Sequence, residues 1–306
     1  MITKKYIVSI CLMLMVGLGI IIYYENLEPQ QPEQLIIPPT TEEVEPEEEM
    51  LNPIYPNESN VAYSLQNDTL QVTWDDGLSW TKVPIVIDSL FTGEYNGNKE
   101  ELIENSFVMT KDMVAFLYQS AGLQIIYTDN KGVDWKEVTV AENAIGMRYR
   151  KVDFLAEDFW YVLISGERTM SQEGAMIYYS VDQGTNWHTT NMPNTTRLIA
   201  DGGFVNNKTG FIAYGTINPD AIDMYVTNDV GETWNQVVVQ MPSKYDRVFV
   251  LPNAPYQVED KLEMIVDQGP NGDYMGGYIQ GKFQSSDQGH TWEFVEEVDP
   301  TYGEEN

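Results

Sequence analysis

Three of the five arginines in this chain occupy similar places in its sequence. Arg150 in RYRKVDF, Arg197 in TRLIADGGF and Arg247 in DRVFVL each stand just before a short run typical of a β-strand. A guanidinium group carries several N–H donors in one plane and binds the oxygens of an anion in pairs. If the three strands line one opening, these arginines predict an anion-binding site on a very acidic protein.

The alternative for these arginines is structural. Half-buried arginines are normally paired with acids, and Asp153, Asp201 and Asp246 lie close to them in the sequence. Arginines paired in this way would hold loops together and bind no ligand. The sequence favours pairing and leaves the anion site open.

Other chemistry finds little support in the sequence. His188 and His290 are the only histidines, and neither has a second ligand at metal-site spacing. No Gly-rich phosphate loop before a helix, GxSxG or HExxH motif occurs. Calcium needs six or more oxygens, and turns with one carboxylate each do not supply them. We therefore predict no catalytic residue, no metal and no cofactor.

The strands that would position the arginines are connected by a turn whose sequence motif occurs five times in the chain. Each copy has Ser or Thr, then Asp or Asn two residues later, Gly two after that, and Trp three further on. The Asp or Asn accepts backbone hydrogen bonds, Gly permits a positive φ, and the Trp packs at the start of the next strand. We predict structural roles for Asp75, Gly77, Trp80, Asn130, Gly132, Trp135, Asp182, Gly184, Trp187, Asp229, Gly231, Trp234, Asp287, Gly289 and Trp292.

The spacing of the turns predicts the architecture. They begin at residues 73, 128, 180, 227 and 285, so the steps are 55, 52, 47 and 58 residues. Most repeats contain four strand-like runs, as in GGFVN, GFIAYG, DMYVT and TWNQVVVQ. This pattern predicts an all-β protein, a β-propeller of five four-stranded blades. The first repeat lacks a clear innermost strand, which residues 51–55 must supply unless it is missing.

The five turns resemble the Asp-box, or BNR, repeat of the sialidase-like and photosystem-assembly-factor-like β-propellers. The resemblance covers roughly residues 50–298 and implies that each turn joins the third and fourth strands of a blade. That superfamily includes glycosidases, receptors and assembly factors. The resemblance therefore implies a fold and does not select an activity.

The resemblance also gives a test for sialidase activity. Sialidases use an arginine triad, an early Arg-Ile-Pro motif, a Tyr/Glu nucleophile pair and an Asp acid/base. The Arg-Ile-Pro motif is absent here, and no arginine precedes Arg148. We therefore favour a non-catalytic binding module. A diverged exo-glycosidase that uses an acid such as Asp201 or Glu259, and an assembly factor for a membrane complex, are the alternatives.

The N-terminal region reads as an anchor and a spacer. Residues 6–24 contain no charge and follow Lys4 and Lys5, so 1–24 predict a cytoplasmic stub and a transmembrane helix. A cleaved signal peptide is disfavoured because no small-residue cleavage site follows. A lipoprotein anchor at Cys11 is disfavoured because Ile10 stands where a small residue is needed. Residues 25–50 form an acidic, Pro-rich linker, 51–300 the propeller and 301–306 an acidic tail.

Charge and cysteine content narrow the partners. The net charge of −30, from 47 acidic and 17 basic residues, opposes binding to nucleic acid. One cysteine allows no internal disulfide, which suggests a bacterial surface protein. We expect a single-pass protein of the cell membrane with the propeller outside the cytoplasm. Its expected partner is a protein or a cell-surface glycan. Surface tyrosines such as Tyr274 and Tyr278 are a second candidate site, although packing between blades explains them better.

Overall fold

The computed structural model describes residues 14–18, 20, 23, 50–94, 97–155 and 158–299. The chain divides into two compact units, residues 1–50 and 51–306. In the first unit residues 14–18 are helical. Among the residues described, no helix is both long and apolar enough to cross a membrane. Much of the predicted 6–24 span, nearly all of the linker and the whole acidic tail lie outside the described residues.

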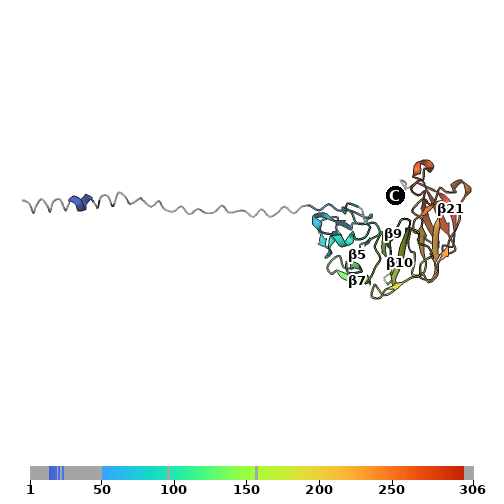
Figure 1. Ribbon diagram of the computed structural model, residues 1–306, viewed down its shortest axis with the longest axis horizontal. Helices are drawn as coiled ribbons and strands as arrows, with labels where there is room; N and C mark the ends of the chain where they lie inside the picture. The colour runs from blue at the N-terminus through green and yellow to red at the C-terminus, as the bar shows by residue number, and fades with distance from the viewer. Residues whose placement is uncertain are drawn as a thin grey trace, which may run out of the picture. The chain divides into compact units, whose positions relative to one another are not determined.

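The second unit consists of five β-sheets that follow one another in chain order, and we call them blades one to five (Figure 1). The predicted all-β architecture of four-stranded antiparallel sheets is confirmed for blades two to four, and blades one and five depart from it. The strands are β1 (Ala62–Ser64), β2 (Gln71–Thr73) and β3 (Thr81–Lys82) in blade one; β4 (Phe107–Met109), β5 (Val114–Gln119), β6 (Leu123–Thr128) and β7 (Lys136–Ala141) in blade two; β8 (Tyr149–Phe154), β9 (Trp160–Thr169), β10 (Gln172–Ser180) and β11 (His188–Thr189) in blade three; β12 (Ile199–Phe204), β13 (Gly210–Tyr214), β14 (Asp223–Thr227) and β15 (Asn235–Gln236) in blade four; and β16 (Val238–Gln240), β17 (Leu251–Pro252), β18 (Tyr256–Val258), β19 (Lys261–Asp267), β20 (Gln280–Ser285) and β21 (Thr291–Val298) in blade five.

Two departures from the predicted strands have local causes. Ile54 forms a single antiparallel bridge with Tyr63, through N–H···O bonds of 2.8 and 3.0 Å, so the innermost strand of blade one is reduced to one residue. The predicted run TWNQVVVQ is divided between two blades. Its β15 ends blade four after two residues, and β16 then pairs in parallel with β21, where it covers the outer edge of blade five.

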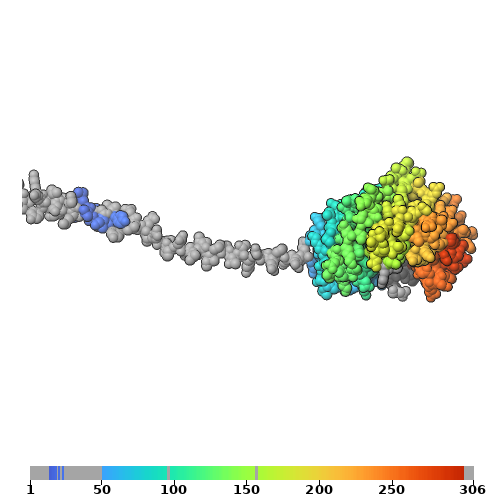
Figure 2. Space-filling view, turned by 90° about the horizontal axis from the view of Figure 1, so that it is seen from below, coloured from blue at the N-terminus to red at the C-terminus, as the bar shows by residue number. Residues whose placement is uncertain are grey.

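Neighbouring blades are joined by four clusters of buried side chains. The second strands of blades two to four, β5, β9 and β13, bury consecutive residues. Successive side chains point to opposite faces of a sheet, and each face packs against a neighbouring blade. Among the described residues no buried cluster joins blade five to blade one. The colours of Figure 2 follow the same chain order across the unit. Each cluster has members from two blades, such as Val72 and Phe116 for blades one and two, Ile125 and Val162 for two and three, Tyr161 and Ile212 for three and four, and Phe211 and Trp292 for four and five.

The repeated turn has the same hydrogen bonds in every copy. In blade three the Ser180 hydroxyl donates to Asp182 Oδ1 at 2.8 Å and accepts the Gly184 N–H at 2.9 Å. Asp182 Oδ1 also accepts the Asn186 N–H at 2.8 Å. The glycine is required for space as well as for its positive φ. In blade five a Cβ added to Gly289 would lie 2.3 Å from the Phe211 ring in blade four.

The turn tryptophans differ in burial. Trp292 is fully buried within β21, whereas the other four are half-buried and lie one residue before the next strand. The Trp292 ring therefore packs deeper in the core than the rings of the other four turns.

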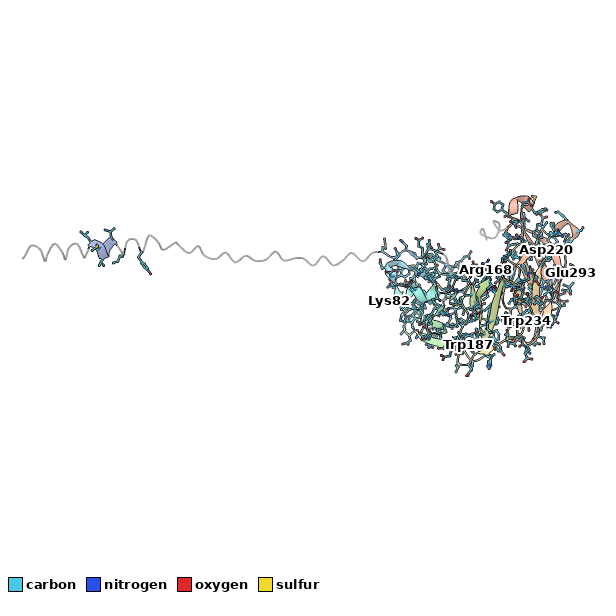
Figure 3. All side chains as sticks on the ribbon, viewed as in Figure 1. Lys82, Arg168, Trp187, Asp220, Trp234 and Glu293 are labelled. Atoms are coloured by element: carbon cyan, nitrogen blue, oxygen red, sulfur yellow. The ribbon has the colours of Figure 1, made fainter. Side chains whose placement is uncertain are left out.

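The antiparallel strand order gives each blade two different ends. The first and third hairpins, including the five turns, lie at one end, which we call the Asp-box end. The second hairpin and the connection to the next blade lie at the other, which we call the crossover end. Figure 3 shows this division, with Trp187 and Trp234 at one end and Arg168 and Asp220 at the other. Short helices η1 (Gln66–Asp68), α2 (Ile87–Leu90), η2 (Ser243–Tyr245) and η3 (Tyr274–Gly277) belong to the crossover end.

Candidate functional site

All five arginines of the chain lie at the crossover end. Arg148 and Arg150 stand at the start of β8, Arg168 near the end of β9, Arg197 before β12 and Arg247 before β17. Each of these places is the beginning of a first strand or the end of a second strand. The Asp-box end has lysines instead. Lys111 and Lys208 occupy first hairpins, and Lys131 occupies the turn of blade two.

Arg150 does not reach the surface of this end. Its side chain is buried and donates to the backbone oxygens of Leu90 at 3.0 Å, Thr92 at 2.5 Å and Met147 at 3.1 Å. Burial lowers the pKa of this guanidinium to about 10. The expected partner Asp153 is three residues away on the same strand, and side chains at odd spacing point to opposite faces. Arg150 therefore fastens the segment after α2 to blade three.

Arg197 is exposed and paired, but with a different acid from the one expected. Its Nη1 lies 2.5 Å from Oδ2 of Asp223, at the start of β14, and the arginine side chain remains 48% exposed. It borders a depression of about 270 Å³ that Ser171 and Ile217 also line. The guanidinium is therefore accessible at the crossover end while partly neutralised.

Arg247 is the arginine most available to a ligand. It is exposed, and within the described part of the chain its side chain forms no ion pair or hydrogen bond. It therefore does not pair with Asp246. Its φ of 60° is unusual for a residue with a side chain, and such strain is often found at functional sites.

Arg247 borders a depression of about 140 Å³ between blades four and five. Asn271 Nδ2 donates to Asn218 Oδ1 at 2.8 Å and links loops of the two blades at this place. Asp273 is the single acidic residue of the lining, and the depression offers the Arg247 guanidinium and the amides of Asn218 and Asn271. Such a set of donors suits a carboxylate or another planar anion.

The three arginines therefore have different surroundings. Arg150 is buried against the segment that follows α2, and Arg197 and Arg247 border separate depressions at the same end. Of the three predicted arginines, two therefore present exposed guanidinium groups at the crossover end, and these two do not share a single funnel. Among the described residues, no group of three or more His, Cys, Asp or Glu side chains is placed to hold a metal ion.

Asp201 is one of the acids considered for a glycosidase, and its oxygens are occupied. Oδ1 accepts the Tyr149 hydroxyl at 2.6 Å, Lys151 Nζ at 3.1 Å and its neighbour Gly202 N–H at 2.7 Å, and Oδ2 accepts the Ala254 N–H at 2.6 Å. Burial alone would raise the pKa of Asp201, but Lys151, the Tyr149 hydroxyl and the two N–H groups together hold it below its usual value. Asp201 therefore joins blades three, four and five.

Glu259, the other acid considered, lies at the opposite end. It occupies the turn between β18 and β19 with a φ of 52°, and that turn belongs to the Asp-box end. A glycosidase needs two carboxyl groups on either side of one bond. Asp201 and Glu259 do not form such a pair.

Two ion pairs at the crossover end were not predicted from the sequence. Arg148 and Glu173 form a bidentate ion pair with bonds of 2.5 and 2.6 Å, and Lys244 pairs with Glu297 at 2.8 Å. The partners are 25 and 53 residues apart. The position of Arg148 two residues before Arg150 was the one local signal for the first pair.

Comparison with known proteins finds solved structures at low identity. No protein-family model and no curated protein matches this chain. Solved structures are similar to it. They include YCF48 bound to D1 peptide, with a TM-score of 0.45, 14% identity, and coverage of 78% of this chain and 64% of that one. A xyloglucanase of family GH74 from Xanthomonas campestris has a TM-score of 0.43 and 15% identity, and the match covers 78% of this chain and 36% of that one. The NanB sialidase from Streptococcus pneumoniae has a TM-score of 0.37 and 11% identity, and the match covers 66% of this chain and 32% of that one.

This chain spans less than two thirds of each of these three structures. At these identities and TM-scores the likeness carries no argument about the activity of this chain.

Proposed function

We propose that this protein is a non-catalytic binding module and that its crossover end receives a carboxylate-bearing segment of a partner protein. The observation that carries the proposal is Arg247. It is an exposed guanidinium without an ionic partner among the described residues, and it borders a depression lined by amide groups. In a chain with 47 acidic residues, an arginine left unpaired is available for an acid of another molecule.

The remaining architecture supports presentation of this end. Buried networks around Glu173 and Asp201 join the blades beneath it, so the loops that carry the arginines stand on a rigid base. We further propose that residues 1–24 anchor the protein in the cell membrane, that 25–50 space the propeller from it, and that the propeller lies outside the cytoplasm. An assembly factor for a membrane complex is one form that such a module could take.

The binding experiment uses carboxylates as the variable. Immobilised peptides with free and with amidated C-termini, and glycans with and without carboxylate sugars, are probed with the full chain and with Arg247→Gln. We expect capture by acidic or free-carboxylate peptides that Arg247→Gln loses. Capture by acidic glycans alone would identify a glycan as the partner and contradict the peptide proposal. Capture that ignores carboxylates would contradict the anion site itself.

The control variant for this experiment is Lys131→Gln. Lys131 is an exposed cation at the Asp-box end with a φ of 57°, and glutamine stands at the equivalent turn position in Gln183 and Gln288. This variant removes one charge without altering the turn. The same proteins are tested against a fluorogenic sialoside and other aryl glycosides. We expect no turnover, and turnover that Arg247→Gln and Arg197→Ala abolish would establish the glycosidase alternative.

A further inference from the structure

A cluster of two tyrosines and one acid at the crossover end of blade five surrounds an ammonium group. Tyr245 lies in η2, Tyr274 in η3, and Glu297 near the end of β21. The two tyrosine rings have centroids 6.0 Å apart and are inclined at 88° to each other. We call these three residues the tyrosine cage. It is occupied by the side chain of Lys244.

The contacts of Lys244 show what the cage binds. Its Nζ lies 4.7 Å from the centroid of the Tyr245 ring and 5.6 Å from that of Tyr274. It also donates to Glu297 Oε1 at 2.8 Å and to the Tyr245 hydroxyl oxygen at 3.1 Å. Aromatic faces beside a carboxylate are the groups with which proteins recognise organic ammonium ions.

The walls of the cage are held independently of Lys244. Tyr245 is buried and packs on Phe249 and Phe294, at centroid distances of 5.0 and 4.6 Å. The backbone of Tyr274 is fixed by buried Gln268, which accepts its N–H and donates to its carbonyl, both at 2.9 Å. Both tyrosine hydroxyls donate to Glu297 Oε1, at 2.5 and 2.7 Å.

The occupant is held much less firmly than the walls. The Lys244 side chain is 61% exposed, and it is a flexible stem whose charge remains largely in water. An exposed ion pair of this kind contributes about 0–1 kcal/mol. Another ammonium group can therefore replace it at little cost.

We propose that the tyrosine cage is a docking site for a lysine side chain of a partner protein, and that Lys244 covers the site until the partner displaces it. A primary ammonium is the expected ligand because the cage offers oxygen acceptors, which a quaternary ammonium cannot use. Tyr274 also lines the depression beside Arg247, so the two sites adjoin. The lysine site does not depend on the carboxylate proposal.

The test uses small lysine analogues as probes. Dissociation constants of Nα-acetyl-lysine methylamide are measured by calorimetry for the full chain, for Lys244→Ala and for Lys244→Ala/Glu297→Gln. The norleucine analogue lacks the ammonium, and the trimethyl-lysine analogue has a quaternary one. We expect Lys244→Ala to bind the lysine probe about two- to fivefold more tightly than the unmodified chain, because the variant removes a tethered competitor that is held only weakly.

The other expected results follow from the contacts. Loss of the Glu297 charge abolishes binding, the norleucine probe does not bind, and the trimethyl probe binds more weakly than lysine. Lys131→Gln, at the Asp-box end, leaves lysine binding unchanged, and retention of lysine binding in Arg247→Gln separates this site from the carboxylate site. Equal affinity of the unmodified chain and Lys244→Ala would overturn the proposal, as would binding that persists without the Glu297 charge or that favours the trimethyl probe. Thermal unfolding of each variant confirms that it is folded.

Discussion

Glu173 accepts two bonds from the Arg148 guanidinium, at 2.5 and 2.6 Å, and its Oε1 also accepts the Ile199 N–H at 2.6 Å. The glutamate side chain is fully buried, and the arginine side chain is 20% exposed. Because Arg148 and Glu173 belong to blade three and Ile199 to blade four, this carboxylate joins two blades directly beneath the arginines of the crossover end.

Glu173→Gln is expected to lower the free energy of unfolding by about 3–5 kcal/mol, since it leaves a largely buried arginine without its counter-charge. Urea unfolding measures the change. The matched control is Asp223→Asn, which removes the acid from an ion pair whose arginine is about half exposed. The control should cost less than about 1 kcal/mol. Similar losses in both variants would show that the Glu173 pair has no special role.

Asp201 and Asp153 are expected to respond to pH in opposite directions. The folded pKa of Asp201 is lowered, so its stabilising effect is present above the unfolded value of about 3.9 and is lost as pH falls through the folded value. Burial raises the folded pKa of Asp153, so its stabilising effect is present below about 3.9 and is lost as pH rises through the folded value.

At pH 7, Asp201→Asn should therefore cost about 1–3 kcal/mol, whereas Asp153→Asn should leave stability unchanged or increase it. Thermal unfolding of both variants is measured between pH 3 and pH 7, because this interval includes the ordinary carboxyl pKa of about 4. A stabilising Asp201→Asn would contradict the network described for Asp201.

The turn of blade two predicts which substitution the other turns tolerate. Asn130 Oδ1 accepts the Thr128 hydroxyl at 2.9 Å and the Asp134 N–H at 3.0 Å, the same pattern that Asp182 makes in blade three. Asp182→Asn keeps this acceptor and should have a small effect. Asp182→Ala leaves three donors without this acceptor, the Ser180 hydroxyl and the backbone and side-chain N–H groups of Asn186, and should cost about 1–3 kcal/mol. Equal melting temperatures for the two variants would show that the acceptor is unimportant.

The membrane anchor is tested by fractionation. The full chain should sediment with membranes and resist extraction at high pH, and the fragment 25–306 should remain in the supernatant. The measurement compares the fraction, membrane or supernatant, in which the fragment and the full chain are recovered. A full chain recovered in the supernatant would contradict the anchor, and a chain shortened at its N-terminus would indicate a cleaved signal peptide.

The sequence predicts the fold well because its determinants are local. A turn closed by its own Ser or Thr, Asp and Gly within five residues repeats at strand-compatible spacing, so blades two to four could be placed almost strand by strand. The division of TWNQVVVQ between two blades was missed because it depends on the free edge of β21, which is distant in sequence.

The site is less predictable because its contacts are not local. Arg150 and Asp153 are close in sequence but lie on opposite faces of β8, and Arg197 pairs with Asp223, 26 residues away. The tyrosine cage combines Tyr245, Tyr274 and Glu297 from three segments. Sequence indicated which end carries the arginines, and only the structure shows that Arg247 has no ion-pair or hydrogen-bond partner among the described residues.

The central claim is tested most directly by one dissociation constant measured for three proteins. The ligand is an acidic peptide that the full chain captures among the immobilised peptides, and the proteins are the full chain, Arg247→Gln and Lys131→Gln. We expect Arg247→Gln to weaken binding at least tenfold, equivalent to about 1.4 kcal/mol, and Lys131→Gln to bind as the unmodified chain does. Unchanged affinity in Arg247→Gln, or equal losses in both variants, would show that the crossover end is not the carboxylate site.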